Sequence, residues 1–564
     1  MAKHNKSGCN IGSVFDAIFV LPYPFSDHPS FPEGLLKRAL EHAGFSVGII
    51  EKPFWQRPES FTVLGRPRLF FAVISGPVDS IVLNYTSSRK RRMEDLYQLR
   101  GESFFPGYPP SVSYKIRPDR TTVVFSQRLR EAYRGVPVII GGIEASLRLF
   151  AHYDFQQDAL RRSILLDSRA DLLVTGPGEK QLTGVAELLN RGAQIEEINL
   201  AGTAKVSRTK EYYQRAVELP SYEEIKALPF KLVEAHMLLE KALHNCQGVI
   251  QRHGDRLIAA EAPEHYSQED LDRIYGLPYK RTHNFKDSFS PALRMNLFSV
   301  TSHRGCAGGC SFCSLNLKEG RRVISRSHDS ILREIKGFAA HPAWKGYVSD
   351  IGGPSAEMYG SSCAGKTCLR SSCLLPSRCR GFEWGRPYLQ LLRDCRMLPG
   401  VKKIFVGSGL RYDLLLRYPD LLEEIMLHHC GKFIRIAPEH TEENVLCLMG
   451  KPSFKSLEDF VSLFNYIKKG LKRDVQLCPY LIVGHPGETA RDVPAMKEKL
   501  SSLGLGTTDV QIFTPTPGTL STAMYWAGYD PSGNAIPVEK NLKTLTMRRT
   551  YVSSSNFYRN KAAT

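Results

Sequence analysis

The sequence predicts an α/β protein of 564 residues with a doubly wound parallel sheet followed by a full or partial (β/α) barrel. Short apolar runs alternate with segments of helical periodicity, and each run ends in glycine, proline or polar residues, as buried parallel strands do. A second series of this kind begins near Pro291, after a polar, Pro-containing stretch. The length allows roughly three units of about 150 residues each.

Residues 12–215 are expected to form the N-terminal Rossmann-like α/β domain. Its strand candidates are apolar throughout, so we expect helices on both faces of the sheet. They are 16–21, 45–50, 70–74, 80–83, 136–140 and 171–175. Residues 216–290 are expected to be a helical connector, with helices over 221–228 and 232–243 that are separated by Pro229.

Residues 291–525 are expected to form the barrel, with functional groups at the carboxyl ends of its strands. A Cys-rich insertion, 355–385, lacks hydrophobic periodicity, and residues 526–564 are expected to be a poorly ordered C-terminal tail. The strand candidates of the barrel are 297–302, 347–351, 403–406, 433–437, 476–483 and 510–513.

Composition narrows the class of protein. Hydrophobic residues make up 42% and charged residues 23%, which excludes global disorder. No apolar stretch is long enough to cross a membrane, and the N-terminus shows no export signal. The 13 cysteines concentrate between residues 306 and 395, which indicates metal binding in a reducing cytoplasm rather than disulfides.

The net charge of +18 permits anionic partners, nucleic acid among them. The run Arg89-Lys-Arg-Arg92 could contact phosphate, although such runs are usually solvated surface. One hypothesis is therefore a non-catalytic nucleic-acid-binding protein with a structural metal site.

The most informative segment contains Cys306, Cys310 and Cys313 directly after a predicted strand. Glycines within this loop let it curl so that the three thiolates converge. Iron–sulfur clusters are normally held by four thiolates, so three would leave one iron of a 4Fe-4S cluster open for a ligand. A zinc site completed by His303 or a distant residue is the alternative, but zinc favours paired C-x2-C units.

This loop, with the aromatic Phe312 before its last cysteine, resembles the signature of the radical SAM superfamily. From about residue 12 to 525 the chain resembles the YgiQ-type uncharacterised radical SAM proteins, through motifs such as Ile139-Ile-Gly-Gly142 and Asp350-Ile-Gly-Gly-Pro354. The resemblance implies a radical SAM barrel whose cluster binds and reductively cleaves S-adenosyl-L-methionine. A 5'-deoxyadenosyl radical then attacks an unknown substrate.

The same resemblance implies an electron donor such as flavodoxin or ferredoxin, and a catalytic role for the cysteine triad. Because members of the family continue into a further C-terminal region, we expect a shortened or divergent end here. The residues that the resemblance or their strand-end positions assign to cofactor contacts are Phe312, Gly352, Gly353, Ser408, Arg435, Ile482 and Gly484.

Some of these assignments rest on particular motifs. Gly352 and Gly353 match an element that receives the methionine amino group, although Pro354 stands where the family has Glu. The segments 481–489 and 513–519 resemble the last barrel strands of methylthiotransferases. Transfer of a methyl or methylthio group to RNA is therefore an alternative within the class.

Two further sites stay open. Cys363, Cys368, Cys373 and Cys379 could bind a second cluster or zinc, or could be free thiols. The N-terminal domain is cobalamin-binding-like in its glycine motifs, but it lacks the Asp-x-His-x-x-Gly element that supplies a lower histidine ligand. A structural or substrate-positioning role is therefore favoured over cobalamin binding.

Overall fold

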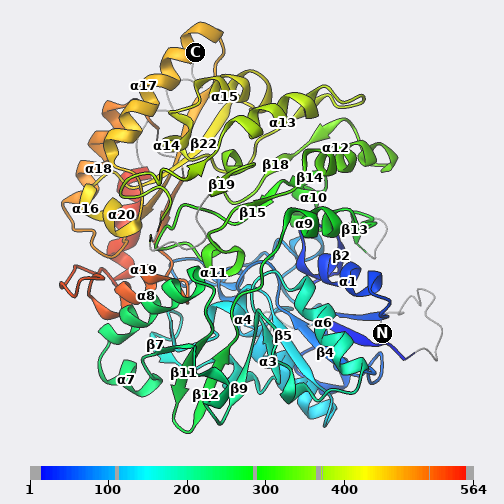
Figure 1. The fold of residues 1–564 in the computed structure, drawn as a ribbon. Helices are drawn as coiled ribbons and strands as arrows, with labels where there is room; N and C mark the ends of the chain where they lie inside the picture. Colours follow the sequence, from blue (N-terminus) through cyan, green and yellow to red (C-terminus); the bar gives the residue numbers. More distant parts are fainter. Residues whose placement is uncertain are drawn as a thin grey trace.

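The computed structural model describes residues 14–107, 114–283, 289–363, 370, 372–506 and 509–553. Figure 1 shows the N-terminal strands and helices in its lower half and the second α/β series above them. The predicted α/β class, a wound sheet followed by a partial barrel, is confirmed.

The first unit is built on a nine-stranded sheet. Its strands β3, β1, β4, β5 and β8 are mutually parallel, and β9 then joins β8 in the antiparallel sense. In sheet order the strands are β10 (Val217–Leu219), β11 (Val249–His253), β12 (Arg256–Ala260), β9 (Thr203–Ser207), β8 (Leu172–Val174), β5 (Val138–Gly141), β4 (Phe70–Ile74), β1 (Ala17–Leu21) and β3 (Val47–Glu51).

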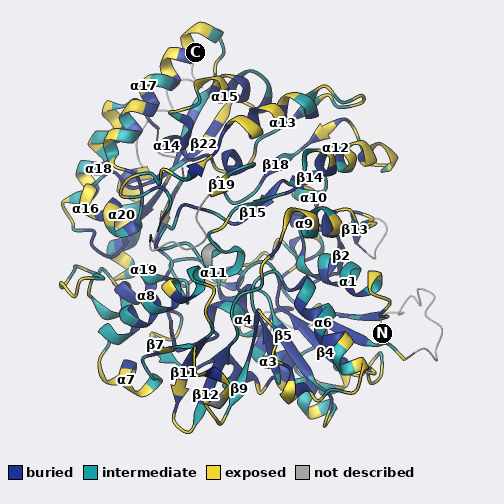
Figure 2. Ribbon diagram, in the orientation of Figure 1, coloured by how far each residue is buried: buried dark blue, intermediate teal, exposed yellow. Residues whose placement is uncertain are grey.

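Helices cover both faces of the parallel part, as its continuously apolar strands require. On β1, Ile18 and Val20 pack in the cluster that contains α3 and α5, whereas Phe19 packs in the cluster with α1 and α6. Figure 2 shows these strands as buried. The covering helices are α1 (Pro32–His42), α3 (Thr121–Ala132), α5 (Ile164–Ser168) and α6 (Glu179–Asn190).

Two expectations for this unit are wrong. The segment 80–83 is not a strand but lies in helix α2 (Ser80–Asn84), because the Asp79 carboxylate caps it by accepting from the Ile81 backbone N–H at 2.9 Å. The stretch 216–290 is also not a purely helical connector, since it supplies β10, β11 and β12 to the first sheet. Gly254 and Asp255 form the two-residue turn of the β11–β12 hairpin, a signal that the sequence carried.

The second unit is a partial barrel whose main strand pairs are parallel. β14 pairs with β18, β17 with β21, and β23 with both β22 and β24; a parallel bridge joins Leu410 to Ile436 of β22. The strands are β14 (Ser299–Thr301), β17 (Tyr347–Val348), β18 (Asp350–Gly352), β21 (Lys403–Ile404), β22 (Phe433–Glu439), β23 (Gln476–Val483) and β24 (Asp509–Ile512).

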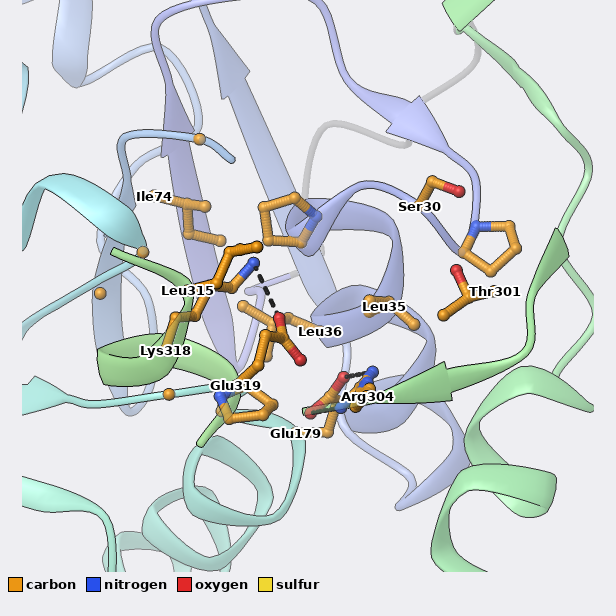
Figure 3. Close-up of a pocket in the computed structure, with 18 of the residues that line it drawn as sticks. Ser30, Leu35, Leu36, Ile74, Glu179, Thr301, Arg304, Leu315, Lys318 and Glu319 are labelled. Carbon is orange, nitrogen blue, oxygen red and sulfur yellow. Dashed lines mark hydrogen bonds and ion pairs between the residues drawn. The ribbon is translucent and has the colours of Figure 1, made fainter. Parts of the chain in front are cut away.

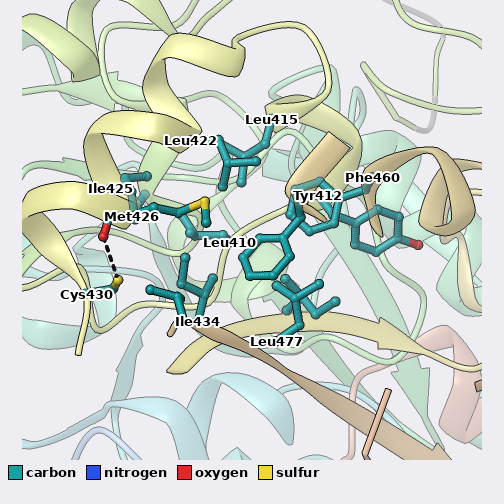
Figure 4. Packing of buried hydrophobic residues seen from close by; sticks show 14 of the residues in the cluster. Leu410, Tyr412, Leu415, Leu422, Ile425, Met426, Cys430, Ile434, Phe460 and Leu477 are labelled. Atoms are coloured by element: carbon teal, nitrogen blue, oxygen red, sulfur yellow. Dashed lines mark hydrogen bonds between the residues drawn. The ribbon is translucent and has the colours of Figure 1, made fainter. Parts of the chain in front are cut away.

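The core of the second unit lies between these strands and an outer layer of helices. Figure 4 shows Ile434 and Leu477, from β22 and β23, against Tyr412, Leu422 and Phe460 of that layer. The helices are α12 (His328–Gly337), α13 (Arg386–Arg396), α14 (Tyr412–Leu415), α15 (Pro419–Glu424), α17 (Phe454–Leu471), α18 (Asp492–Ser502) and α20 (Leu542–Ser553).

Helix α20 corrects the expectation of a poorly ordered tail over 526–564. Leu545 and Val552 are buried in the barrel core, and α20 packs on β24 and α18. Its apolar residues are too few to reveal a helix by periodicity, so tertiary packing decides its position. Residues 554–564 lie outside the described part of the chain.

The remaining helices and strands complete the description. They are β2 (Ser26–Asp27), α4 (Ile143–Leu147), β6 (His152–Asp154), β7 (Ala159–Arg161), α7 (Tyr222–Ala227), α8 (Phe230–His244), α9 (Gln268–Tyr275), β13 (Thr282–His283), α10 (Pro291–Asn296), β15 (His303–Arg304), α11 (Leu315–Glu319), β16 (Ile324–Ser325), β19 (Ser362–Cys363), β20 (Phe382–Glu383), α16 (Glu443–Met449) and α19 (Leu520–Ala527).

Candidate functional site

The cysteine loop leaves β15 and ends at α11, and backbone packing fixes its first turn. Gly305 has φ +84°, and a Cβ there would lie 2.0 Å from the carbonyl oxygen of Arg322, so only glycine fits. The Cys306 backbone N–H donates to the Gly320 carbonyl at 3.2 Å. Cys306 is therefore held against the segment that connects α11 to β16.

The middle of the loop is anchored by Ser311. Its backbone N–H donates to the Met449 carbonyl at 3.0 Å, and its Oγ donates to the Leu448 carbonyl at 2.6 Å. Its own carbonyl accepts from the Ser521 N–H at 3.0 Å. The loop is thus held between the end of α16 and the start of α19, two contacts that no sequence pattern indicated.

The three thiols are partly enclosed and act on one another electrostatically. Burial, followed by the neighbouring Cys310, raises the pKa of Cys306 and raises that of Cys313 to about 12. The Arg411 Nη1 donates to Cys310 Sγ at 3.7 Å. Without a metal the Cys306 and Cys313 thiols are protonated at neutral pH, so iron binding to them must release protons.

The donor set suits an iron–sulfur cluster, which thiolates hold and which hydrogen bonds to sulfur tune. In the part of the chain that the structure describes, no three His, Cys, Asp or Glu side chains are placed to hold one metal ion. Cluster thiolates bind separate irons and need not converge on a single point.

Arg411 belongs to a buried polar group beside the triad. Asp413 accepts from its guanidinium at 3.1 and 3.0 Å, and the Arg411 backbone N–H donates to Glu357 Oε1 at 3.0 Å. Glu357 is fully buried, its Oε2 has no partner among the described residues, and burial raises its pKa to about 7. Sequence reasoning missed Glu357, although it stands only four residues after Gly353.

The predicted glycine pair lies at the end of β18, where two side chains approach it closely. A Cβ at Gly352 would lie 2.6 Å from Ser408 Oγ, and one at Gly353 would lie 2.6 Å from the His303 ring. Ser408 in turn donates through Oγ to Asp350. The structure therefore brings Gly352, Gly353 and Ser408 together, and it gives the glycines a packing reason.

Phe312 and Ile482 pack in the same apolar cluster. The His485 ring lies 6.4 Å from the Phe312 ring, centroid to centroid, and the Lys451 ammonium lies 6.0 Å from the Phe312 centroid. Gly484 has φ +80°, and a Cβ there would lie 2.3 Å from Leu545 Cδ2 of α20.

Arg435 is exposed on β22, while its neighbours Ile434 and Ile436 point into the helix-covered core. Among the described residues, Arg411 is the arginine that contacts a thiol of the triad, and Arg435 makes no ion pair. Farther along β22, Glu439 adopts φ +67°, and its Oε1 lies 3.7 Å from the Lys451 Nζ. A left-handed backbone at a buried glutamate is costly and concentrates at functional sites.

Two cavities adjoin this region. The smaller, about 320 Å³, lies where the carboxyl ends of the first sheet face β14 and β18, and Gly352, Gly353 and Ser408 line it. Figure 3 shows the ion pair between Glu179 and Arg304 at its edge, with nitrogen and oxygen 2.7 Å apart. The larger, about 520 Å³, reaches the cysteine loop at Ala307, Ser311 and Cys313.

Comparison with known proteins identifies the family. The family model described as radical SAM N-terminal matches residues 4–299. A UPF0313 protein of Geobacter sulfurreducens is 44% identical over 531 residues, which cover 92% of this chain and 86% of that protein. The chain belongs to the UPF0313 family of radical SAM proteins. A UPF0313 protein of Clostridium botulinum is 38% identical over 557 residues, which cover 96% of this chain and 85% of that one.

The fold agrees with this membership. The radical S-adenosylmethionine methyltransferase TsrM from Kitasatospora setae, solved with tryptophan and a SAM analogue, aligns with a TM-score of 0.50. At 15% identity the alignment covers 93% of this chain and 84% of TsrM, so it shows a shared fold. The UPF0313 chain is a radical SAM enzyme that uses a 4Fe-4S cluster and S-adenosyl-L-methionine. No helix among its described residues is long and apolar enough to span a membrane.

In this UPF0313 protein, Asp27 and His28 are engaged within the fold. Asp27 accepts from Arg38 at 3.0 Å, and His28 Nε2 lies 2.7 Å from the Arg281 guanidinium. Helix α11 covers the sheet edge closely, since a Cβ at Gly176 would lie 3.2 Å from the Lys318 carbonyl oxygen.

The Cys-rich insertion packs directly on the cysteine loop. The Cys373 N–H donates to the Ala307 carbonyl at 3.3 Å, and Cys373 and Cys379 pack in the same apolar cluster as Cys306. Cys363 is exposed, and Cys368 lies outside the described residues. A second cluster or zinc at these cysteines stays a prediction.

The basic run 89–92 lies at the protein surface, where Lys90, Arg91 and Arg92 are exposed. The Arg89 guanidinium lies 5.1 Å from the Phe155 ring centroid, and that of Arg91 lies 4.9 Å from the Phe104 centroid. Arg92 Nε donates to the carbonyl of Tyr85 at 3.0 Å. These contacts anchor the three arginine side chains of the run on the protein surface.

Proposed function

We propose that Cys306, Cys310 and Cys313 hold the catalytic 4Fe-4S cluster and that S-adenosyl-L-methionine occupies the adjoining cavity of about 320 Å³. The observation that carries this proposal is the contact between Arg411 and Cys310 Sγ, beside the unpartnered buried oxygen of Glu357. A buried cation beside sulfur stabilises a thiolate, and a buried carboxylate oxygen without a partner suits a cationic ligand group.

Residues at the glycine pair and beside the cysteine loop divide the cofactor between them. We assign the methionine ammonium to Glu357 and to backbone carbonyls near Gly352 and Gly353, where the absence of side chains permits close approach. We assign the adenine to the apolar surface formed by Phe312 and Ile482. Arg411 acts as a positioning residue, because Asp413 fixes the guanidinium that faces Cys310.

When bound, the reduced cluster supplies one electron that splits the sulfonium into methionine and the 5'-deoxyadenosyl radical. The electron must come from a low-potential donor, for which a flavodoxin or ferredoxin is suited. We place the enzyme in the reducing cytoplasm, because 11 of its cysteines are free thiols among the described residues.

We further propose a division of labour between the two units. The barrel from about residue 291 to 525 would hold cluster and cofactor, and the unit before residue 290 would close the site from the opposite side. Glu179 of α6 and Arg304 of β15 support this division, since their buried ion pair joins the two units beside the smaller cavity.

The test is anaerobic reconstitution with iron and sulfide, followed by reduction and measurement of 5'-deoxyadenosine by chromatography. We expect the wild-type chain to bind about four irons at the triad and to release 5'-deoxyadenosine. Cys310→Ala should lose both properties, whereas Cys430→Ala, a change in the barrel core, should keep them. A Cys310→Ala variant that still cleaves the cofactor would contradict the assignment.

A further inference from the structure

The larger cavity, about 520 Å³, borders the cysteine loop and shares Arg304, Lys318 and Glu319 with the lining of the smaller cavity. Helix α8, the segment after α4, helix α11 and the Cys-rich insertion form its walls, and Ser311 and Cys313 border it. Its volume falls within the roughly 300–1,000 Å³ of sites that enclose small organic molecules. A molecule held there would lie beside the cluster loop.

His236 is one of the polar side chains of this cavity that lack a hydrogen-bond partner among the described residues. It lines the cavity from α8, and it is 6% exposed. No described residue donates a hydrogen bond to its ring or accepts one from it, although buried polar groups are nearly always hydrogen-bonded. Burial lowers its pKa to about 4, so at neutral pH one ring nitrogen donates and the other accepts.

Some neighbouring polar groups are engaged within the protein. One turn along α8, Glu240 accepts from the Arg321 guanidinium at 2.8 Å. At the α11 wall, Lys318 and Glu319 pair with each other at 3.5 Å, but Glu319 Oε2 has no hydrogen-bond partner among the described residues, and neither has Ser146 Oγ. Hydrogen-bonding capacity therefore remains unfilled at several side chains that line the cavity, and a ligand is the natural partner for them.

The wall around His236 is apolar. Leu239 and Leu243 lie three and seven residues further along α8, on the same helix face, and both line the cavity. Leu149 and Phe150 line it from the segment after α4. The cavity therefore offers an apolar surface around His236, and charged side chains such as Glu261 and Arg322 line it elsewhere.

We propose that this cavity is the substrate site and that its substrate is a small organic molecule with an apolar portion and several polar groups, one of them hydrogen-bonded by His236. A cavity of this volume encloses a small molecule rather than a folded macromolecule. The inference rests on the proposed function, because a cluster at Cys306, Cys310 and Cys313 is what would make the neighbouring cavity an active site.

The probe is Nile red, a neutral apolar dye with a carbonyl acceptor, whose emission shifts to the blue in apolar surroundings. It is titrated into the anaerobically reconstituted full chain. We expect saturable binding in the wild type and at least a tenfold loss in Leu239→Trp, which fills the cavity. Met237→Trp is the matched control, since Met237 lies on α8 but is 42% exposed and does not line the cavity.

Three further variants keep the test decisive. Leu239 belongs to a packed core, so His244→Trp, at a less buried position of the cavity wall, supplies a second block if Leu239→Trp does not fold. His236→Phe should weaken binding several-fold by removing the hydrogen bond, and His236→Gln should restore part of the affinity. Equal affinity of the wild type and both blocking variants would overturn the inference, as would an unchanged affinity in His236→Phe.

The iron content of the same preparations separates the two proposals. If the dye binding responds to the variants but the triad holds no iron, the proposed function fails and the cavity assignment as a ligand site stands. If the triad holds iron and cleaves the cofactor but the dye binding ignores the variants, only the present inference fails.

Discussion

Replacing Gly305 by alanine should displace the cysteine loop that carries the proposed cluster ligands. The new Cβ would stand 2.0 Å from the Arg322 carbonyl oxygen, whereas real Cβ atoms do not approach closer than about 3.0 Å. The β15–β16 pairing next to this point consists only of His303 with Ser325 and Arg304 with Ile324. A shift of about 1 Å in that backbone would therefore disturb the start of the loop that carries Cys306.

The magnitude follows from two separate costs. A left-handed backbone at a residue with a Cβ costs roughly 1–2 kcal/mol, and forcing atoms into a packed site costs roughly 1–3 kcal/mol more. Gly320→Ala is a matched control for the first cost alone, because Gly320, between α11 and β16, has φ +76° and a Cβ there would meet nothing within 4 Å. We therefore expect a total loss of about 2–5 kcal/mol for Gly305→Ala against about 1–2 kcal/mol for Gly320→Ala.

The assay combines the free energy of unfolding in urea with iron content after anaerobic reconstitution. Gly305→Ala should lose stability and iron, while Gly320→Ala should lose a little stability and keep its iron. If Gly305→Ala binds as much iron as Gly320→Ala and unfolds at the same urea concentration, the backbone contact at Arg322 does not hold the cluster loop.

The other predictions concern tuning, packing and pH. Arg411→Gln should lower the reduction potential of the cluster, measured by redox titration with EPR detection, because the cationic donor to Cys310 is lost; an unchanged potential would argue against that contact. Leu545→Ala should cost about 2–5 kcal/mol of unfolding free energy, since Leu545 is 2% exposed in the barrel core; a loss below about 1 kcal/mol would mean that α20 does not dock there. His236 has its pKa lowered to about 4, so the unfolded chain binds the proton first and stability falls as pH drops from about 6.5 to 4. This histidine alone accounts for about 3 kcal/mol, so His236→Phe should flatten that part of the stability curve.

The sequence alone was sufficient for the fold class and for the chemistry of the centre. Periodicity is a local property, so the apolar runs that became β1, β4, β5 and β8 could be assigned before any packing was known. The cysteine triad could also be recognised from the sequence, because the spacing of three thiols in one short loop is a local feature. The prediction of a strand over 80–83 was wrong, because it considered only the apolar character of the segment. The Asp79 carboxylate caps a helix there instead.

Only the tertiary structure decided which distant groups serve the centre. Arg411 meets Cys310 across about a hundred residues of chain, and Glu357 and His236 are notable for lacking partners among the described residues, which no single sequence segment can show. Helix α20 has too little apolar periodicity to be found locally, yet it docks because Gly484 leaves space for Leu545. Contacts of this kind depend on which surfaces the fold brings together, so physical proximity in three dimensions, and not residue order, determines them.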